Sequence, residues 1–382
     1  MPDFARRSAS LTAEPSRDTP QDPSRLARVE RTRAEMMAQG SAISTTLERE
    51  ADAVIALAQR LAEQRFDRAV IAGCGDSWFV GIAVRHAWET LTGLPLEPVQ
   101  ALDYAAYNVA TASRRTLVIG LSAGGNTPAV MAALQGAKDR GAFTIGLSNT
   151  PGSQILTNFD AGLVIHATRK GWPTQSSTAA IALLARLAAA LGTGAGSAGG
   201  EPVERCRRDA FLAELARIPD LMDRTAAALD PEVAVIAERV APAALILFTG
   251  LGPNFAAAAF GAAKVKELSP IHALATPLEE MHHYRSPKRG DPLFIVATDP
   301  ASRERALDTA LVAHAAGAHP VAILARRDPD IEAHVWHTLF VPEVSPLLAP
   351  LLSSVPLHLF AYHFAKARFA RGLGYPGGLG EA

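Results

Sequence analysis

The sequence predicts an α/β protein that is built from two parallel sheets, each covered by helices on both faces. Three observations carry this prediction. Short apolar runs of strand length alternate with Ala-rich segments of helical character. The alternation stops at a stretch rich in Gly, Ala and Ser and then starts again. Each half opens with a strand, a glycine turn and a helix, in AVIAGCGDSWFVGIAV and LILFTGLGPNFAAAAFGAA, which indicates an internal duplication.

The first part of the chain is expected to form a tail and one complete domain. Residues 1–25 are rich in Ser, Pro, Asp and Arg, a composition typical of a disordered tail. Residues 26–190 are the first predicted domain, which begins with two helical patterns between Glu30 and Gln64. The buried strands predicted for this domain are Arg68–Ala72, Leu96–Ala101, Thr116–Leu121, Phe143–Leu147 and Gly162–Ile165.

A linker and a second domain complete the chain. Residues 191–204 are rich in Gly, Ala and Ser and are predicted to be a flexible linker. Residues 205–382 are the second predicted domain, which ends with a long helix from about Leu348 to Arg371. The strands predicted for this domain are Ala244–Thr249, Leu293–Ala297, Pro320–Leu324 and Thr338–Val341.

The composition excludes several classes of protein. Of the 382 residues, 48% are hydrophobic and 20% are charged, which gives enough apolar material for buried cores. Lys and Arg number 37 against 38 Asp and Glu, without a run of like charges, so we expect no binding to nucleic acid or to a membrane. The two cysteines, Cys74 and Cys206, are too few for a disulfide framework. The N-terminus lacks the apolar core of a signal peptide, so a cytoplasmic protein is expected.

Three polar turns in the first half are candidates for an anion site. They lie in Ile71–Ser77, Val118–Leu134 and Pro173–Leu187. In a parallel sheet all three turns would lie at the carboxyl edge, where the free N–H groups of helix N-termini bind phosphate. Side chains that would join them are Ser77, Ser122, Thr127 and Ser176, while Gly124 and Gly125 would allow close approach of the backbone. For any single turn the alternative is an ordinary helix cap beside a glycine turn.

Titratable residues gather in one short segment of the second half. Lys264 and Glu267 are three residues apart and share a face of a helix, and the alternative interpretation is a surface ion pair near the end of that helix. His282 and His283 follow Glu280. A histidine pair beside acidic residues is a candidate for proton transfer or for metal binding.

We expect neither a metal nor a cofactor. The other histidine pairs of the sequence lack a carboxylate or a cysteine at ligand spacing. GCGDSWFVG has a wrongly spaced third glycine for a dinucleotide-binding loop, and no convincing acidic residue ends the following strand. A GxxxxGKS or GxxxxGKT loop is also absent from the sequence.

Taken in order, these motifs resemble the SIS (sugar isomerase) family, in particular its tandem members. These include the isomerase domain of glucosamine-6-phosphate synthase and the fructosamine-6-phosphate deglycases. The resemblance covers about residues 31–371. GCGDS is similar to the family's G-C-G-T/S-S, LSAGGNT to its phosphate loop S-x-S-G-E-T, and EMMAQGSAISTTL to its first helix. GLGPNFAAAAFGAAKVKELSPIHA and VPLHLFAYHFAKARFARG are similar to its catalytic helix and its last helix.

The resemblance implies two SIS domains, each a five-stranded parallel sheet flanked by helices in a flavodoxin-like three-layer sandwich. It implies that the sugar phosphate is bound by Ser77, Ser122, Gly124, Gly125, Thr127 and Ser176, with residues 174–177 closing the pocket. Further substrate-binding residues would be Gly75, Asp76, Thr174 and Glu280.

The resemblance also implies catalytic roles. Glu267 would move a proton between C1 and C2 of an open-chain sugar, next to Lys264. His283 falls where the family has the histidine that opens the ring or helps to protonate the leaving group. In the synthase this histidine comes from the neighbouring subunit, which implies a homodimer with its active site at the subunit interface.

Departures from the family pattern narrow the expected function. Ala123 and Gly124 stand where the family often has Gln and Ser, which removes one hydroxyl ligand of the phosphate, and Asn126 replaces the usual Glu. We recognise neither an N-terminal glutaminase domain nor the synthase's C-terminal lysine, so amidotransfer is not expected. We predict a deglycase or an aldose–ketose isomerase for an amino-sugar or fructosamine 6-phosphate, with the deglycase favoured. The alternative is a non-catalytic sensor that binds the sugar phosphate to control a partner.

Overall fold

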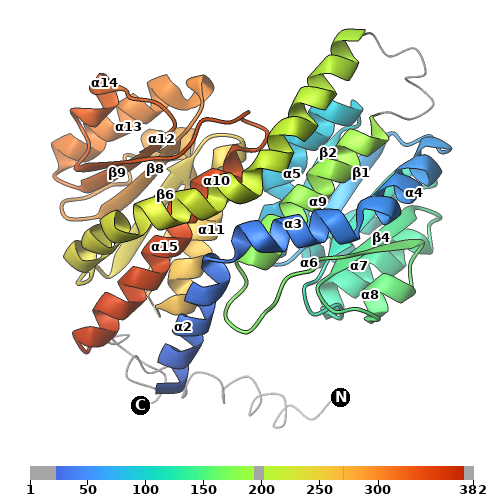
Figure 1. Ribbon diagram of the computed structural model, residues 1–382, viewed down its shortest axis with the longest axis horizontal. Helices are drawn as coiled ribbons and strands as arrows, with labels where there is room; N and C mark the ends of the chain where they lie inside the picture. Colours follow the sequence, from blue (N-terminus) through green and yellow to red (C-terminus); the bar gives the residue numbers. More distant parts are fainter. Residues whose placement is uncertain (1–22, 193–201, 270, 374–382) are drawn as a thin grey trace.

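The structure, a computed structural model, describes residues 23–192, 202–269 and 271–373. Within these residues, each half of the chain forms one five-stranded sheet in which all neighbouring strands are parallel (Figure 1). The first sheet has the order β2-β1-β3-β4-β5, with β1 (Arg68–Gly73), β2 (Leu96–Gln100), β3 (Thr116–Leu121), β4 (Phe143–Ser148) and β5 (Ala161–Val164). The second has the order β7-β6-β8-β9-β10, with β6 (Leu245–Gly250), β7 (His272–Pro277), β8 (Pro292–Ala297), β9 (His319–Leu324) and β10 (His337–Phe340).

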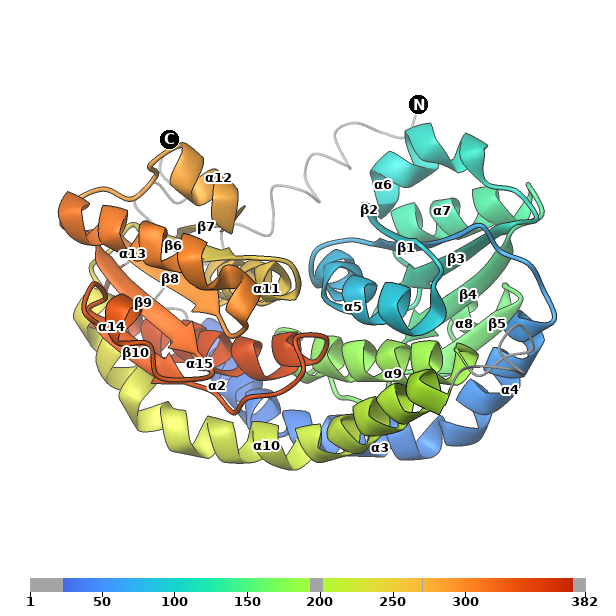
Figure 2. The ribbon, with the colours of Figure 1, turned by 90° about the horizontal axis from the view of Figure 1, so that it is seen from above.

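Helices lie on both sides of each sheet (Figure 2). In the first half they are α2 (Pro23–Met36), α3 (Gln39–Arg49), α4 (Ala51–Ala62), α5 (Asp76–Thr92), α6 (Ala101–Asp103), α7 (Pro128–Lys138), α8 (Gln154–Thr157) and α9 (Gln175–Leu191). In the second half they are α10 (Pro202–Val240), α11 (Pro253–Leu268), α12 (Leu278–His283), α13 (Arg303–Ala316), α14 (Pro329–Glu332) and α15 (Ala349–Ala370). None of the described helices has the length and apolar character needed to cross a membrane.

The structure confirms the predicted fold class of two five-stranded parallel sheets flanked by helices. Each strand range predicted from the sequence overlaps an observed strand, and the predicted last helix corresponds to α15. The two helical patterns predicted between Glu30 and Gln64 correspond to the three helices α2, α3 and α4, and neither β7 nor α10 is predicted. The edge strand β7 is only partly buried, which weakens its apolar signal. Helix α10 contains Pro219 and Pro231, and proline usually ends a helix.

The predicted tail and linker overlap helices at their ends. Helix α2 begins at Pro23, so the last residues of the predicted 1–25 tail are helical, and residues 1–22 lie outside the described residues. Helix α9 extends to Leu191 and α10 begins at Pro202, so both ends of the predicted 191–204 linker are also helical. The rest of that linker, residues 193–201, lies outside the described residues.

The two halves repeat one topology, with β1 to β5 corresponding in order to β6 to β10. The turn after the first strand has the same backbone in each half. Gly75 has φ 55° and ψ −128°, and Gly252 has φ 54° and ψ −124°. Glycine adopts a positive φ at little cost, which explains its presence in both turns. The chain is therefore an internal duplication, and its halves can be compared position by position.

Helices join the two halves. Helix α5 of the first half packs against α11 of the second, and α11 packs against α15. Helix α10 packs against both α15 and α3, and it extends along both sheets in Figure 2. A continuous group of buried apolar side chains includes residues from both halves. This packing fixes α11 next to α5, the helix that follows the first glycine turn.

Candidate active site

A pocket of about 280 Å³ opens at the carboxyl edge of the first sheet. The turns after β1 and β3 and the first turn of α9 line this pocket, and α11 of the second half reaches it. The predicted site residues in its wall are Gly75, Asp76, Ser77, Ser122, Gly124, Thr127, Ser176 and Glu267. The structure therefore brings the three polar turns of the first half together with the glutamate of the second.

The turn after β1 positions two side chains of the pocket. Gly73 ends this strand, and a Cβ atom there would lie 2.5 Å from the carbonyl carbon of Ser77. Gly75 precedes α5 and has the positive φ described above. Only glycine permits both the close approach and this conformation without strain. The tight turn places Asp76 and Ser77, in the first turn of α5, at the pocket wall.

Hydroxyl groups shape the turn after β3. Ser122 Oγ and Thr127 Oγ1 lie 2.8 Å apart in a hydrogen bond, and Ser122 Oγ accepts the N–H of Gly125 at 3.1 Å. Gly125 has φ 77°, and a Cβ atom there would lie 2.2 Å from Ser153 Oγ. Gly125 thus forms the back of the turn, whereas Gly124 lines the pocket. The structure gives these two predicted glycines different positions.

The first turn of α9 contributes two serines to the pocket. Ser176 Oγ donates to Asn149 Oδ1 at 2.6 Å, and Ser177 Oγ lies 3.5 Å from Asp76 Oδ2. Both serines line the pocket. Thr174, immediately before α9, is fully buried and lies outside the pocket wall. Thr174 takes part in the start of the helix through its backbone carbonyl, which accepts the N–H of Ser177 at 3.0 Å.

A buried ammonium group lies behind the pocket wall. Lys264 of α11 is fully buried, and its Nζ forms ion pairs with Asp76 Oδ2 at 2.6 Å and with Glu267. Burial alone would lower the pKa of Lys264, but the two carboxylates outweigh this effect and raise the pKa above its ordinary 10.5. Lys264 therefore stays protonated, and its interpretation as part of a surface ion pair is wrong.

Glu267 lies where the two halves meet. Its side chain is 32% exposed and lines the pocket, while its backbone carbonyl accepts a hydrogen bond from Arg25 Nη2 at 2.9 Å. Burial raises the pKa of Glu267 above its ordinary 4.5, and the charge of Asp76 acts in the same direction, against the opposing effect of Lys264. One ammonium group is thus shared by two carboxylates, and the charge of Arg28 also lowers the pKa of Glu267. A carboxyl group with a raised pKa in a polar pocket is suited to accept and return a proton.

Besides Gly125, Thr174 and Lys264, two further predicted site residues lie outside the pocket wall. His283 and Glu280 are exposed on α12, and neither lines the pocket of its own chain. The His283 ring packs edge-on against Tyr284, with 5.1 Å between ring centroids. Within one chain, His283 is therefore not part of the site that contains Glu267.

The pocket also contains residues that the sequence analysis does not identify. Cys74, Arg169 and Pro173 line it. Arg169 belongs to the segment TRKGWPTQSS, which precedes the polar start of α9. Arg169 lies six residues before the first residue of α9, and no local pattern in the sequence marks it as a site residue. The N–H groups of helix N-termini bind phosphate without a cationic side chain, so the three polar turns do not by themselves indicate an arginine.

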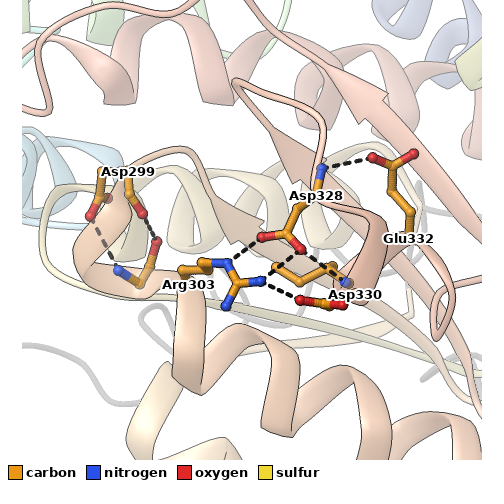
Figure 3. A network of polar contacts seen from close by, with 7 residues as sticks. Asp299, Arg303, Asp328, Asp330 and Glu332 are labelled. Carbon is orange, nitrogen blue, oxygen red and sulfur yellow. Dashed lines mark hydrogen bonds and ion pairs between the residues drawn. The ribbon is translucent and has the colours of Figure 1, made fainter.

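The equivalent edge of the second sheet is filled by the chain itself. Asp299 follows β8 at this edge (Figure 3). Its carboxylate accepts hydrogen bonds from the N–H groups of Ala301 at 3.0 Å and Ser302 at 3.2 Å. Asn254 Nδ2, near the start of α11, donates to the other carboxylate oxygen at 2.8 Å. Asn254 stands two residues after Gly252, as Ser77 does after Gly75. In the second half, the Asp299 carboxylate therefore connects the turn after β8 with the start of α11. The equivalent elements of the first half, the turn after β3 and the start of α5, enclose the pocket.

Comparison with known proteins reveals relatives of this chain. The SIS domain profile matches residues 60–190 and 240–368. The chain is 33% identical over 321 residues to glutamine–fructose-6-phosphate aminotransferase (isomerizing) of Thermus thermophilus, an alignment that covers 83% of this chain and 52% of that protein. The enzyme of the same name from Mycolicibacterium smegmatis is 33% identical over 351 residues, or 87% of this chain and 54% of that protein. The chain thus spans about half the length of the curated relatives it matches.

Solved structures share the fold. The C-terminal domain of glucosamine-fructose-6-phosphate aminotransferase from Francisella tularensis superposes with a TM-score of 0.75 at 21% identity, covering 88% of this chain and 96% of that chain. Tagatose-6-phosphate ketose/aldose isomerase from Escherichia coli gives a TM-score of 0.71 at 18% identity, covering 92% and 95%. At these identities the likeness establishes the fold alone.

Removal of the buried ammonium group tests the charge arrangement behind the pocket. Lys264→Met leaves Asp76 and Glu267 without their shared cation. We expect the free energy of unfolding to fall by about 3–5 kcal/mol, because one partner of a buried ion pair is lost. Lys266→Met removes an exposed ammonium group from the same helix and should change stability by less than about 0.5 kcal/mol. Equal stability of the two variants in urea denaturation would contradict this arrangement.

Proposed function

This chain belongs to the SIS domain family, and we propose that it is a phosphosugar-processing enzyme acting on an amino-sugar or fructosamine 6-phosphate. The proposed reaction is aldose–ketose isomerisation or deglycation by glutamate acid/base catalysis. The observation that carries the proposal is one pocket that contains both the polar turns of the first half and Glu267 of the second. The named relatives support the substrate class, since fructose 6-phosphate and tagatose 6-phosphate appear in their names.

The phosphate group is proposed to bind at the turns of the first half. The N-termini of α5, α7 and α9 meet at the pocket, and their free N–H groups and positive dipole ends favour an anion. Hydroxyl groups of Ser77, Ser122 and Thr127 add neutral donors, and Ser176 lies in the same wall. A phosphate held there leaves the carbon atoms at the other end of an open-chain sugar for Glu267.

Glu267 is proposed to transfer the proton. In an isomerase, its carboxylate removes a proton from the carbon beside the carbonyl group, which gives an enediol, and returns the proton to the adjacent carbon. In a deglycase, removal of the C1 proton gives an enaminol, and protonation at C2 gives an imine at C1. Water adds to C1 of this imine, the C1–N bond breaks with protonation of the nitrogen, and an amine and an aldose phosphate are released. Lys264 contacts the Glu267 carboxylate from behind the pocket wall, so its proposed role is to orient this group.

His283 is proposed to act across a subunit interface. It lies exposed on α12, outside the pocket of its own chain. Large apolar side chains are exposed close to it along the chain, with Tyr284 69% and Leu274 of β7 54% exposed. A partner chain bound at this surface would bury both side chains. In the proposed homodimer, His283 and Glu280 of one chain complete the pocket of the other.

Glu267→Gln separates an enzyme from a sensor. We expect turnover of fructosamine and hexosamine 6-phosphates to fall by about 10²–10⁴-fold, because the proton acceptor is lost. Calorimetry should show phosphosugar binding close to that of the wild type. Glu63→Gln, on the exposed surface, should retain both properties. Release of an amine would identify a deglycase and aldose–ketose exchange an isomerase, whereas a wild-type protein that binds these ligands and converts none of them would be a sensor.

The pH dependence of kcat tests the environment of Glu267. Glu267 must be ionised to accept a proton, so kcat rises as the pH passes the pKa of this group. Because burial raises that pKa, we expect the ascending limb at a pH above the 4.5 of an ordinary glutamate. The quantity to measure is kcat, since it reports ionisation in the enzyme–substrate complex. A limb at or below pH 4.5 would show that Glu267 is not the group that titrates.

Mixed dimers test the shared active site. His283→Asn and Glu267→Gln should each be inactive as purified homodimers. When the two variants are unfolded together and refolded, a mixed dimer contains one site with wild-type Glu267 from one chain and wild-type His283 from the other. We therefore expect activity to return on mixing. A lack of recovery, with mixed dimers demonstrated by mass spectrometry, would argue against catalysis across the interface.

A further inference from the structure

We propose that Arg169 binds the phosphate group of the substrate and replaces a serine hydroxyl that the phosphate loop of this chain lacks. The proposal rests on the proposed function and adds a binding residue to it. Gly124 stands where the SIS family pattern often has Ser. Among the described residues that line the pocket, Arg169 is the one with a basic side chain.

The guanidinium group of Arg169 lies close to Gly124. A Cβ atom built on Gly124 would be 3.4 Å from Nη1 and 3.9 Å from Nη2 of Arg169. A serine side chain at position 124 would thus reach the same part of the pocket as the guanidinium group. The structure places an arginine side chain beside the position from which the expected hydroxyl is missing.

The guanidinium group of Arg169 has no ion pair or hydrogen bond to any residue in 23–192, 202–269 and 271–373. Two arginines of the neighbouring helix α2, in contrast, bind other residues of the chain. Arg33 pairs with Asp230 at 2.6 Å, and Arg31 Nε donates to the carbonyl of Lys170 at 3.2 Å. A guanidinium group offers five N–H donors in a planar fork, which suits two-point contact with a phosphate. Arg169 is exposed at the pocket, so these donors are available to a group that enters it.

The buried carboxylate of Glu35 holds the segment that carries Arg169. It accepts hydrogen bonds from Thr168 Oγ1 and the Lys170 N–H, both at 2.7 Å, and from the Gly171 N–H at 3.2 Å. These contacts lie on both sides of Arg169 in the sequence, so its backbone is fixed against α2. A fixed backbone lowers the entropic cost of directing the side chain toward a ligand.

The charge balance of the pocket also favours a free cation at this position. A phosphate ester carries a charge of about −1.5 to −2 at pH 7. The carboxylates of Asp76 and Glu267 are already present, and Lys264 is engaged by both. Helix N-termini and hydroxyl groups supply only partial charges. Arg169 supplies a full positive charge on the side of the pocket formed by the phosphate loop.

Calorimetric titration with fructose 6-phosphate and with inorganic phosphate tests this assignment. We expect Arg169→Ala to raise both dissociation constants by about 10- to 100-fold, as for loss of a hydrogen bond between charged groups. Lys170→Ala is the matched control, because it removes the same charge from the next residue, which does not line this pocket. It should bind as the wild type does. Arg169→Lys should bind more tightly than Arg169→Ala and less tightly than the wild type, since it keeps the positive charge but loses the planar two-point geometry of the guanidinium group.

A second substitution tests the exchange of hydroxyl for guanidinium. Gly124→Ser restores the hydroxyl of the family pattern, and its Cβ would have no neighbour closer than 3.4 Å. Combined with Arg169→Ala, it should regain part of the lost affinity for both ligands. Failure to regain any affinity would overturn the exchange.

The outcomes separate this assignment from the proposed function. A wild-type protein that binds neither ligand, nor a fructosamine 6-phosphate, would reject the proposed function and this assignment together. A wild-type protein that binds them, with Arg169→Ala binding equally well, would reject only the role of Arg169. An equal loss of affinity in Lys170→Ala would show a general effect of surface charge and would also reject the role of Arg169.

Discussion

The ion pairs of Lys264 hold the site together. Its ammonium group is fully buried and contacts Asp76 of the first half and Glu267 of the second. A buried charge is costly unless it is paired, so the contacts that satisfy it are also those that align α5 with α11. The same contacts set the position of Glu267, whose pKa is raised by burial and by the charge of Asp76 against the effect of Lys264. The proposed proton transfer therefore depends on an electrostatic contact between two copies of one fold.

The sequence allowed the fold to be predicted because strongly apolar strands such as β1 and β3 are buried throughout and are separated by glycine turns. It could not show β7, whose edge position leaves few buried side chains, or α10, which continues through two prolines. The polar turns were recognisable for a similar reason, because parallel strands place their ends at one edge. Arg169 was not recognisable, since its role depends on where a loop folds back and not on local pattern. The burial of Lys264 likewise depends on α5, which lies far away in the sequence.

Duplication has left the two halves with different tasks. The first half retains an open pocket at the end of its sheet, whereas in the second half the Asp299 carboxylate binds the backbone N–H groups and the Asn254 amide at the equivalent edge. An internal carboxylate there satisfies the same donors that an external anion would require. The second half instead contributes Lys264 and Glu267 from α11 to the pocket of the first. One half is thus proposed to bind the ligand and the other to act on it.

Helix α10 has a mechanical consequence. Its 39 residues pack against α15 in one half and α3 in the other, and the helix curves along a path of about 58 Å (Figure 2). A continuous brace of this kind resists hinge bending, because the halves cannot swing apart without breaking its hydrogen bonds or its packing. In the proposed enzyme, substrate and product would then exchange by movements at the rim of the pocket and not by a swing of one half away from the other. Such stiffness favours a reaction in which a proton travels a short, fixed path between neighbouring carbon atoms.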